Sequence, residues 1–316
     1  MQAAILINRS ANNGKSFKKW TLVKKQLSSL DLNECLIVEY DVPFDIEHCI
    51  REIIRTHKIY TFISGGGDGS VNYLLNSLSR IAGDNMEKFT IGAIGLGSSN
   101  DFIKPLGNCI NSIPVRIDCK KIVLSDIGQV RYEDEKGNSR EHLFLINSSV
   151  GLLAKGNYLF NKGDRIINFL KKKNVNLAIE YTALKTLVTH KSYELNIESD
   201  KEMRDLQLTS LSVVKSPYIS GNFKFNQTIS PADGFLGVNY SHNESFFDIV
   251  RTMTDLKNGK FIKDPPLASR QSYLTNHLKV ASNNHVFLET DGEVTIAKNI
   301  EFSIYKEQVN LMGLGY

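Results

Sequence analysis

Hydrophobic residues in the first hundred positions follow two alternating periods. Short continuous apolar runs, typical of buried strands, occur at residues 3–7, 35–40, 58–63 and 89–94. Between them, apolar residues recur with helical spacing at residues 16–30, 46–55 and 71–78. Strands and helices that alternate at this pitch form a parallel sheet with helices on both faces. The pattern therefore predicts a three-layer α/β domain at the start of the chain.

The pattern changes after about residue 112, where strand-like runs follow one another with polar turns between them. These runs lie at residues 116–123, 127–132, 142–146, 193–197, 206–214, 234–240, 278–280, 285–289, 294–297 and 300–305. A single long helical stretch, at about residues 165–189, interrupts them. Consecutive strands joined by short turns predict a mainly antiparallel β-sandwich. We expect the α/β domain at residues 1–124, the β-sandwich at 125–299, and a segment at 300–316 that packs back on the first domain.

Composition narrows the class of protein. The 316 residues are 41% hydrophobic and 23% charged, which is typical of a globular protein of about two domains. No apolar run approaches the ~20 residues that cross a bilayer, and the first residues lack a secretory pattern. The four cysteines form no CxxC pair, and the net charge of +4 does not require a nucleic acid partner. We therefore expect a cytoplasmic protein.

The first candidate site is the glycine-rich turn Ser64–Asn72, with the sequence SGGGDGSVN, which follows a predicted strand and opens a helix. Glycines allow tight turns and close approach of the backbone to a ligand, and a helix N-terminus attracts phosphate. The alternative is a glycine-rich connector with Ser70 as helix cap. The turn has neither the Gly-Lys-Ser/Thr of a P-loop nor the spacing of a dinucleotide fingerprint.

A second turn of the same kind, GLGSSNDF at residues 95–102, follows the next predicted strand. Open α/β sheets bind ligands at the carboxyl ends of their strands. Two such turns on neighbouring strands therefore predict a nucleotide site at this edge of the sheet.

These residues resemble the diacylglycerol kinase catalytic domain family. Gly66–Ser70 resembles its GGDGT motif, Gly97–Phe102 its GTxNDF segment, and Asp291–Glu293 its DGE segment. Further matches occur in the same order, at residues 8–12 (NPxSG in the family), 147–151 and 231–234. NAD kinases and phosphofructokinases share GGDG, but the ordered set is more specific. The chain is similar to the soluble lipid kinases of bacteria.

The resemblance implies a set of nucleotide-binding residues: Asn8, Arg9, Ser10, Asn12, Gly66, Gly67, Asp68, Gly69, Ser70, Asn72, Gly97, Ser98, Asn100 and Asp101. Ser70 and Ser98 stand where the family has threonine, and they keep a hydroxyl for phosphate. Arg9 and Asn12 replace the usual proline and glycine. These two replacements leave the shape of the first loop open, and Arg9 could itself contact phosphate.

The resemblance also implies catalytic carboxylates. Asp291 or Glu293 would be the general base on the acceptor hydroxyl, and the other would assist; the alternative is that Asp291-Gly292 is only a hairpin turn. Asp68 would help to hold the catalytic Mg²⁺, with capping as the alternative for both Asp68 and Asp101.

A second, structural Mg²⁺ site is also implied by the resemblance. It would use the carboxylate of Asp233 and the backbone carbonyls of Ser230 and Phe235. The alternative is again a plain turn.

The implied activity is transfer of the γ-phosphate of ATP, with Mg²⁺, to a lipid hydroxyl, with diacylglycerol as the leading acceptor. Two other functions stay open: an NAD kinase, and a non-catalytic lipid- or nucleotide-binding protein. The basic run Lys171–Lys173 is either a solvated face or a contact with anionic lipid at the inner face of the membrane. The sequence leaves both a monomer and a homodimer open.

Overall fold

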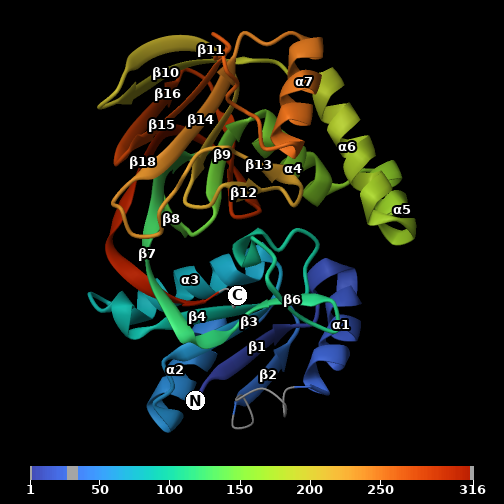
Figure 1. Cartoon of the computed structure of the whole chain (residues 1–316), viewed down its shortest axis with the longest axis vertical. Coiled ribbons are helices and arrows are strands. Elements are labelled where there is room, and N and C mark those ends of the chain that lie inside the picture. Colours follow the sequence, from blue (N-terminus) through green and yellow to red (C-terminus); the bar gives the residue numbers. More distant parts are fainter. Residues whose placement is uncertain (1, 27–34, 314–316) are drawn as a thin grey trace.

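The computed structural model describes residues 2–26 and 35–313 of the chain. Figure 1 shows two halves, one above the other, with both chain ends in the lower half. The lower half is an α/β unit made mostly of the first 117 residues, and the upper half is a β unit flanked by helices.

A parallel sheet forms the centre of the N-terminal half. Its strands β2 (Leu36–Tyr40), β1 (Ala4–Asn8), β3 (Thr61–Gly66) and β4 (Thr90–Gly95) lie side by side in that order. The short antiparallel strand β6 (Ile113–Arg116) also pairs with β4, and β5 (Asn108–Ile110) pairs with β6.

Helices cover both faces of this sheet, because successive side chains of a strand point to opposite faces. Helices α2 (Ile46–His57) and α3 (Asp68–Ala82) pack on the face that carries Ala4 and Leu6. Helix α1 (Lys15–Lys24) packs on the other face, which carries Ile5 and Ile7. The end of the helix predicted over residues 16–30 lies outside the described residues, which resume at residue 35.

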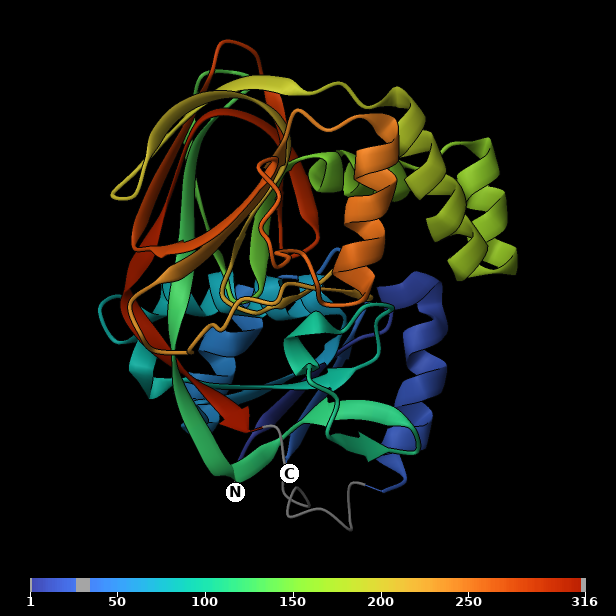
Figure 2. The ribbon, with the colours of Figure 1, turned by 45° about the horizontal axis from the view of Figure 1, so that its top comes forward.

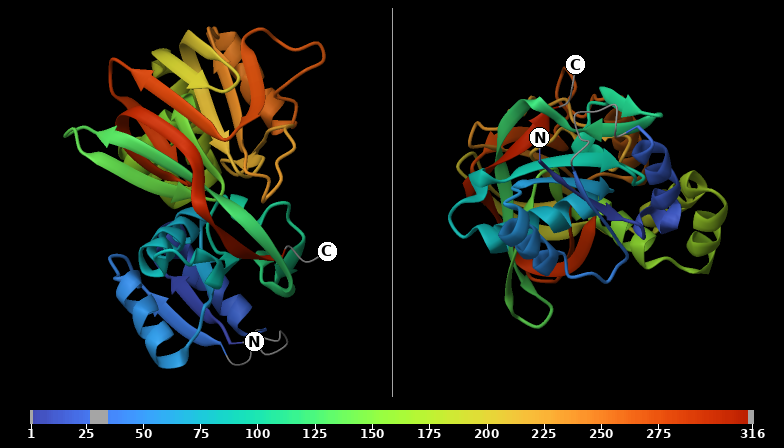
Figure 3. Two further views of the ribbon diagram at one scale, coloured as in Figure 1. Left: turned by 90° about the vertical axis from the view of Figure 1, so that its left-hand side faces the viewer. Right: turned by 90° about the horizontal axis from the view of Figure 1, so that it is seen from below.

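The C-terminal half is a set of antiparallel strands around a second apolar core. One layer has the order β15-β14-β11-β10-β16-β18, and β9 and β17 pair with each other and with strands of this layer (Figure 3). The strands of this half are β7 (Asp118–Asp134), β8 (Ser139–Phe144), β9 (Asn147–Gly151), β10 (Tyr193–Ser199), β11 (Met203–Val214), β12 (Tyr218–Ile219), β13 (Phe223–Lys224), β14 (Leu236–His242), β15 (Arg270–Thr275), β16 (His277–Ser282), β17 (Val286–Thr290) and β18 (Glu293–Gly313).

Two long strands, β7 and β18, connect the halves. They pair antiparallel along most of their length and run together from the β unit down to the parallel sheet (Figure 2). There Asn310 and Leu311 pair with Thr90 and Ile91 of β4. The strands expected separately at residues 116–123 and 127–132 form the single strand β7, so the boundary expected near residue 124 lies within it. The runs at residues 294–297 and 300–305 likewise belong to β18.

The helices of the C-terminal half differ from the prediction. The expected single helix is two, α5 (Arg165–Lys173) and α6 (Val175–Thr189), because Asn174 between them is extended. Two helices were not predicted, α4 (Leu152–Lys162) and α7 (Phe246–Lys257). Helix α4 begins directly after a strand without a polar cap, whereas α7 has a capping box at Ser245 that the sequence does contain.

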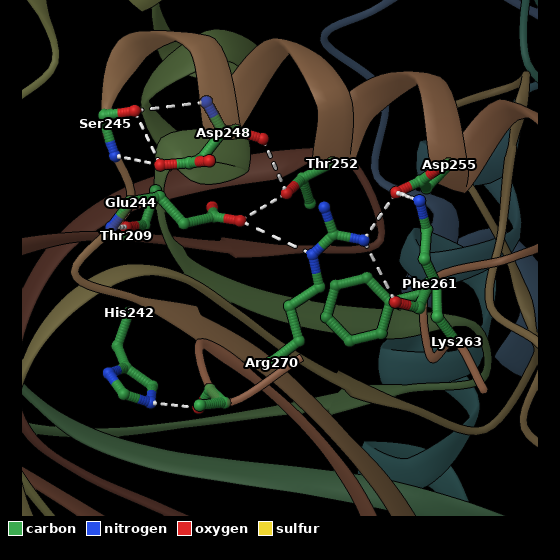
Figure 4. A network of polar contacts seen from close by, with 11 residues as sticks. Thr209, His242, Glu244, Ser245, Asp248, Thr252, Asp255, Phe261, Lys263 and Arg270 are labelled. Atoms are coloured by element: carbon green, nitrogen blue, oxygen red, sulfur yellow. Dashed lines mark hydrogen bonds and ion pairs between the residues drawn. The ribbon is translucent and has the colours of Figure 1, made fainter. Parts of the chain in front are cut away.

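A buried arginine fixes α7 to the β unit (Figure 4). Arg270 on β15 is 2% exposed, and its Nη1 donates to Asp255 Oδ2 at 2.7 Å and to the Phe261 carbonyl at 3.1 Å. Its Nε lies 3.5 Å from the Glu244 carboxylate. Lys263 Nζ lies 2.8 Å from Asp255 Oδ2. Helix α7 is thus held to the β unit by the ion pairs of Asp255 with Arg270 and Lys263, as well as by its apolar residues.

Candidate active site

A cavity of about 990 Å³ lies between the two halves. One wall comes from the segments that follow β1, β3 and β4, and the other from the turn between β17 and β18 and from α4. The sequence-predicted residues that line it are Asn8, Ser10, Asn12, Gly67, Asp68, Gly69, Ser70, Asn72, Gly97, Ser98, Asp101, Asp291 and Glu293. The structure therefore brings the two glycine turns and the DGE segment to one place.

The two glycine turns touch each other. A Cβ on Gly97 would lie 2.4 Å from Gly67 Cα, so no larger residue fits there without a shift of the backbone. The amides of Leu96 and Gly97 donate to the Gly66 carbonyl at 2.9 and 3.0 Å. This close contact places the N-terminus of α3 beside the second turn, and both open into the cavity.

Asp68 links the two glycine turns, and Asp101 joins the second turn to Gly221. Asp68 accepts a hydrogen bond from the Phe102 amide at 3.0 Å, and Asp101 accepts one from the Gly221 amide at 2.9 Å and pairs with Lys104 at 2.7 Å. Burial, and then the nearby Asp101 carboxylate, raise the pKa of Asp68 to about 7. The cap positions themselves belong to Gly67 and Asn100, so neither carboxylate is simply a helix cap.

The loop after β1 only partly matches the prediction. Asn8 Nδ2 donates to Ser70 Oγ at 3.1 Å, which ties this loop to the first glycine turn. The guanidinium of Arg9 pairs instead with Asp41, and Arg9 is not among the described residues that line the cavity. The expectation that Arg9 contacts phosphate does not fit this arrangement, because its guanidinium is paired with the carboxylate of Asp41.

Two further predicted residues, Gly66 and Asn100, shape the site but are not among the described residues that line the cavity. Gly66 ends β3, and a Cβ there would lie 2.3 Å from Ser70 Oγ. Asn100 adopts a left-handed conformation, with φ of 54°, and its Oδ1 accepts a hydrogen bond from the Gly97 amide at 3.1 Å. Both residues hold the glycine turns in place.

The DGE segment is a hairpin turn and also a wall of the cavity. Asp291 is 3% exposed, and its carboxylate accepts hydrogen bonds from the amides of Leu145, Ile146 and Asn147 at 2.9, 3.1 and 2.9 Å. Asn72 Nδ2 donates a fourth bond at 3.0 Å. Burial raises the pKa of Asp291 to about 6 despite these bonds.

Glu293 differs from Asp291 in its surroundings. It is exposed to the cavity, and its Oε1 lies beside Gly69 of the first glycine turn. Within residues 2–26 and 35–313, its side chain makes no hydrogen bond or ion pair. Its carboxylate therefore remains available to a ligand, whereas that of Asp291 is occupied.

Sequence reasoning missed two titratable groups of the cavity. Glu289 accepts hydrogen bonds from Asn147 Nδ2 and Ser149 Oγ, both at 2.8 Å, and burial raises its pKa to about 7. His142 Nε2 lies 2.7 Å from Asn72 Oδ1, and burial lowers its pKa. No spacing in the sequence marks either residue, because these partners are distant in the chain. Asn147 and Ser149 lie 142 and 140 positions before Glu289, and Asn72 lies 70 positions before His142.

Helix α4 adds the last part of the wall. Asn161 Nδ2 donates to the Gly292 carbonyl at 3.0 Å, which joins this helix to the DGE turn. Phe160 lines the cavity, and so does Lys171 of α5, which lies over the Phe160 ring at 4.1 Å.

The residues expected to hold a structural Mg²⁺ lie outside this cavity, in the β unit. The carbonyls of Ser230 and Phe235 lie 3.3 and 2.9 Å from Lys215 Nζ, and Asp233 Oδ1 lies 3.5 Å from it. Asp126 Oδ2 is a fourth neighbour, at 3.3 Å. An ammonium group thus occupies the centre of the expected ligand set.

Two family models match the chain. Residues 2–131 match the diacylglycerol kinase catalytic domain, and residues 161–313 match the YegS C-terminal NAD kinase beta sandwich-like domain. The first part of the chain is therefore similar to the diacylglycerol kinase catalytic domain, and the second part to that β-sandwich-like domain. The predicted α/β domain followed by an antiparallel β-sandwich is thereby confirmed.

The individual proteins to which the chain is similar are distant in sequence. A diacylglycerol kinase of Bacillus subtilis is 24% identical over 249 residues, which are 79% of this chain and 76% of that protein. A crystal structure from Bacillus anthracis covers 99% of this chain and 95% of its own, with a TM-score of 0.70 and 17% identity. A second crystal structure from that organism, of a diacylglycerol kinase, matches with a TM-score of 0.65 and 13% identity. The match covers 99% of this chain and 96% of that one.

A yeast NADH kinase solved with NADH covers 99% of this chain and 83% of its own, with a TM-score of 0.50 and 11% identity. At these identities the solved structures establish the shared fold and leave the substrate of this chain to be argued from its own residues.

Proposed function

We propose that this chain transfers the γ-phosphate of ATP to the hydroxyl of a lipid, with diacylglycerol as the leading acceptor. One observation carries the proposal: the carboxylate of Glu293, which has no hydrogen bond or ion pair within residues 2–26 and 35–313, lies beside the first glycine turn in this cavity. Phosphoryl transfer depends mainly on positioning and charge stabilisation, and this cavity provides both a phosphate-binding wall and a base.

The wall at the carboxyl ends of β3 and β4 is the proposed place for the nucleotide. Gly67, Gly69 and Gly97 allow phosphates to approach the backbone, and Ser70 and Ser98 provide hydroxyls. The described residues include no cluster of three or more His, Cys, Asp or Glu that would hold a metal alone. Asp68 fits Mg²⁺ shared with nucleotide phosphates, which is how Mg²⁺ commonly binds in kinases.

The two acidic residues of the DGE segment have different proposed roles. Glu293 accepts the proton of the acceptor hydroxyl, because its carboxylate is free and faces the cavity. Asp291 is a positioning residue: its four hydrogen bonds hold the turn against residues 145–147 and α3. Bound Mg²⁺ would offset the charge of the phosphates.

A lipid acceptor requires a surface that meets the bilayer, and α5 with α6 provides one. These helices stand out at the right-hand side of the molecule in Figure 1, and Ile166, Phe169, Leu184 and Val188 are exposed on them. Lys172 and Lys173 in the last turn of α5 are exposed, and such residues attract anionic lipid by about 1 kcal/mol each. None of the helices in the described part of the chain is long and apolar enough to span a bilayer.

Incubation with ATP labelled in the γ-phosphate tests the reaction. We expect label in phosphatidic acid when diacylglycerol is offered in mixed micelles, and a lower rate with a sphingoid base. NAD serves as the competing acceptor, because NADH kinase has this fold. Labelled NADP without labelled lipid would contradict the proposal.

Calorimetry separates an enzyme from a binding protein. We expect ATP to bind, and to bind more tightly with Mg²⁺ than without it. The Asp68→Asn variant should lose most of this response to Mg²⁺ and keep its fold. Lipid binding without any ATP binding would favour a non-catalytic protein.

A further inference from the structure

A fully buried ammonium lies where the two halves join. Lys215 follows β11, and its side chain is 1% exposed. Its Nζ has three protons and four oxygen neighbours, on Asp126, Ser230, Asp233 and Phe235, at 2.9 to 3.5 Å. Buried charges of this kind persist only when they are paired. The ammonium offsets the charge of the buried Asp126, and the second carboxylate, on Asp233, is partly exposed to solvent.

This cluster does not fit a magnesium ion. Mg²⁺ binds oxygen at about 2.0–2.1 Å in near-octahedral geometry, so its ligands must converge on one point. That point is taken by Lys215 Nζ, which donates to the carbonyls of Ser230 and Phe235 that the ion would need. The expected magnesium ligands at Ser230, Asp233 and Phe235 therefore have a covalently attached cation as their partner.

We propose that Lys215 is a built-in cation that takes the place of a divalent ion in the β unit of this chain. The cluster then needs no metal to keep its carboxylates together. Any requirement for Mg²⁺ belongs to the nucleotide in the cavity alone. This inference does not depend on the acceptor that the cavity takes.

The cluster joins segments that are far apart in the sequence. Asp126 lies on β7, its Oδ1 accepts a hydrogen bond from Gln308 Nε2 of β18 at 2.7 Å, and its Oδ2 accepts one from the Gly234 amide at 2.8 Å. The pairing of β7 with β18 shifts register between Ile304 and Gln308, where the strands pass from one half to the other. Lys215 thus compensates the charge at the crossing itself.

Lys215 is also connected to the cavity through its backbone. Its amide donates to the Ile146 carbonyl at 2.8 Å, and the Ile146 amide donates to Asp291 Oδ1 at 3.1 Å. The cluster therefore supports the segment that holds the DGE turn, and we class Lys215 as a positioning residue.

Thermal unfolding without nucleotide tests the proposal. The melting temperature of the wild-type protein should be the same in EDTA and in millimolar MgCl₂ or CaCl₂. The Lys215→Ala variant leaves space and two uncompensated carboxylates, so its melting temperature in EDTA should fall by on the order of 10 °C. Millimolar MgCl₂ or CaCl₂ should restore several degrees of this loss, because the same oxygens then accept a divalent ion.

Two further variants keep the test decisive. Asp126→Asn combined with Lys215→Ala removes both charges, so it should unfold at a higher temperature than Lys215→Ala alone and show no rescue by the divalent ion. If Lys215→Ala does not fold in EDTA, the comparison is between the yields of folded protein: the double variant should then give folded protein where Lys215→Ala gives none. Lys263→Ala is the matched control, since it removes another lysine paired with a carboxylate and should show no rescue.

A wild-type melting temperature that rises in MgCl₂ or CaCl₂ without nucleotide, and that the Asp233→Asn variant makes insensitive to these salts, would overturn the proposal. A Lys215→Ala variant as stable in EDTA as the wild type would also overturn it. Failure of these outcomes would leave the kinase proposal intact, because no measurement here uses a substrate.

Discussion

Two buried carboxylates that line the cavity, Glu289 and Asp291, are compensated differently from two that lie outside it, Asp126 and Asp255. Asp291 and Glu289 receive hydrogen bonds from amides and hydroxyls, which carry no net charge. Asp255 of α7 is paired with Arg270, and Asp126 of β7 is paired with Lys215. Neutral donors satisfy the lone pairs of a carboxylate, and a cation also offsets its charge.

The pKa values follow this difference. Burial raises the pKa of Asp291 to about 6 and that of Glu289 to about 7. Burial would also raise the pKa of Asp255, but the bonds to Lys263 and Arg270 outweigh it and lower the pKa below its usual range. Glu289 and Asp291 thus have raised pKa values, whereas Asp255, which is paired with two cations, has a lowered pKa.

The largest expected effect is on turnover. Replacing the proposed base by Glu293→Gln should lower kcat by about 10²–10⁴-fold, the usual contribution of general base catalysis. The affinity for ATP should stay nearly unchanged, because a base on the acceptor hydroxyl does not contact the nucleotide. Initial rates at saturating ATP and lipid, with ATP calorimetry, measure both quantities.

Glu301→Gln is the matched control for this variant. It lies on the same strand but pairs with His277 outside the cavity, so it should keep normal turnover. Normal turnover of Glu293→Gln would mean that Glu293 is not the base. Asp291→Asn would then be the next variant to examine, with its stability measured in parallel.

The next effect is on stability in the cation-paired region. Arg270→Met should lower the free energy of unfolding by about 3–5 kcal/mol, because Glu244 and Asp255 remain buried with too little positive charge. Urea unfolding measures this loss. A loss below about 1 kcal/mol would show that the pairing of α7 with β15 does not depend on the charge of Arg270.

The pH dependence of stability tests the raised pKa of Glu289, whose side-chain hydrogen-bond donors, Asn147 and Ser149, are uncharged. The folded state holds the proton of Glu289 up to pH about 7, whereas its ordinary pKa is 4.5. The free energy of unfolding should therefore fall as the pH rises between these values, because the unfolded state releases the proton first. Glu289→Gln lacks this titration.

We expect the stability of Glu289→Gln, relative to the wild type, to increase by on the order of 3 kcal/mol from pH 4.5 to above pH 7. Urea unfolding at a series of pH values gives the difference, which includes the coupling of Glu289 with the neighbouring Asp291. A difference that does not change with pH would show that Glu289 titrates in its ordinary range.

The smallest effect concerns the proposed lipid surface. Lys172→Gln with Lys173→Gln should weaken binding to vesicles that contain anionic lipid by about 1 kcal/mol per residue, and only at low salt. Vesicle sedimentation measures this. Lys120→Gln with Lys121→Gln on β7 is the charge-matched control and should bind as the wild type does. Equal loss in both pairs would indicate a general charge effect.

The two glycine turns and the DGE turn could be predicted from the sequence, because each depends on residues that are neighbours in the chain. The two glycine turns follow short apolar strands, and the need for glycine at Gly67 and Gly97 comes from their close contact. The DGE turn was visible as an Asp-Gly pair between strands. These features combine residue type with position in a periodic pattern, which one sequence can reveal.

The remaining features depend on residues that only the fold brings together. Arg9 was a candidate for phosphate contact because of its place in the resembling segment at residues 8–12, and its ion pair with Asp41 depends on the fold. Glu289 reads as an ordinary residue of a strand until residues 147–149 are placed beside it. Lys215 is a lone lysine in the sequence, and nothing near it predicts four oxygen neighbours from distant segments.

The pairing of β18 with β4 has a consequence for how the protein is made. The sheet of the N-terminal half includes Asn310 and Leu311, which pair with Thr90 and Ile91. A ribosome releases these last residues only after the β unit has been synthesised. The first half can therefore complete its sheet only when nearly the whole chain is available, and contacts this distant in sequence form slowly. The β unit is in effect an insertion within the first half, and both halves reach their final structure together.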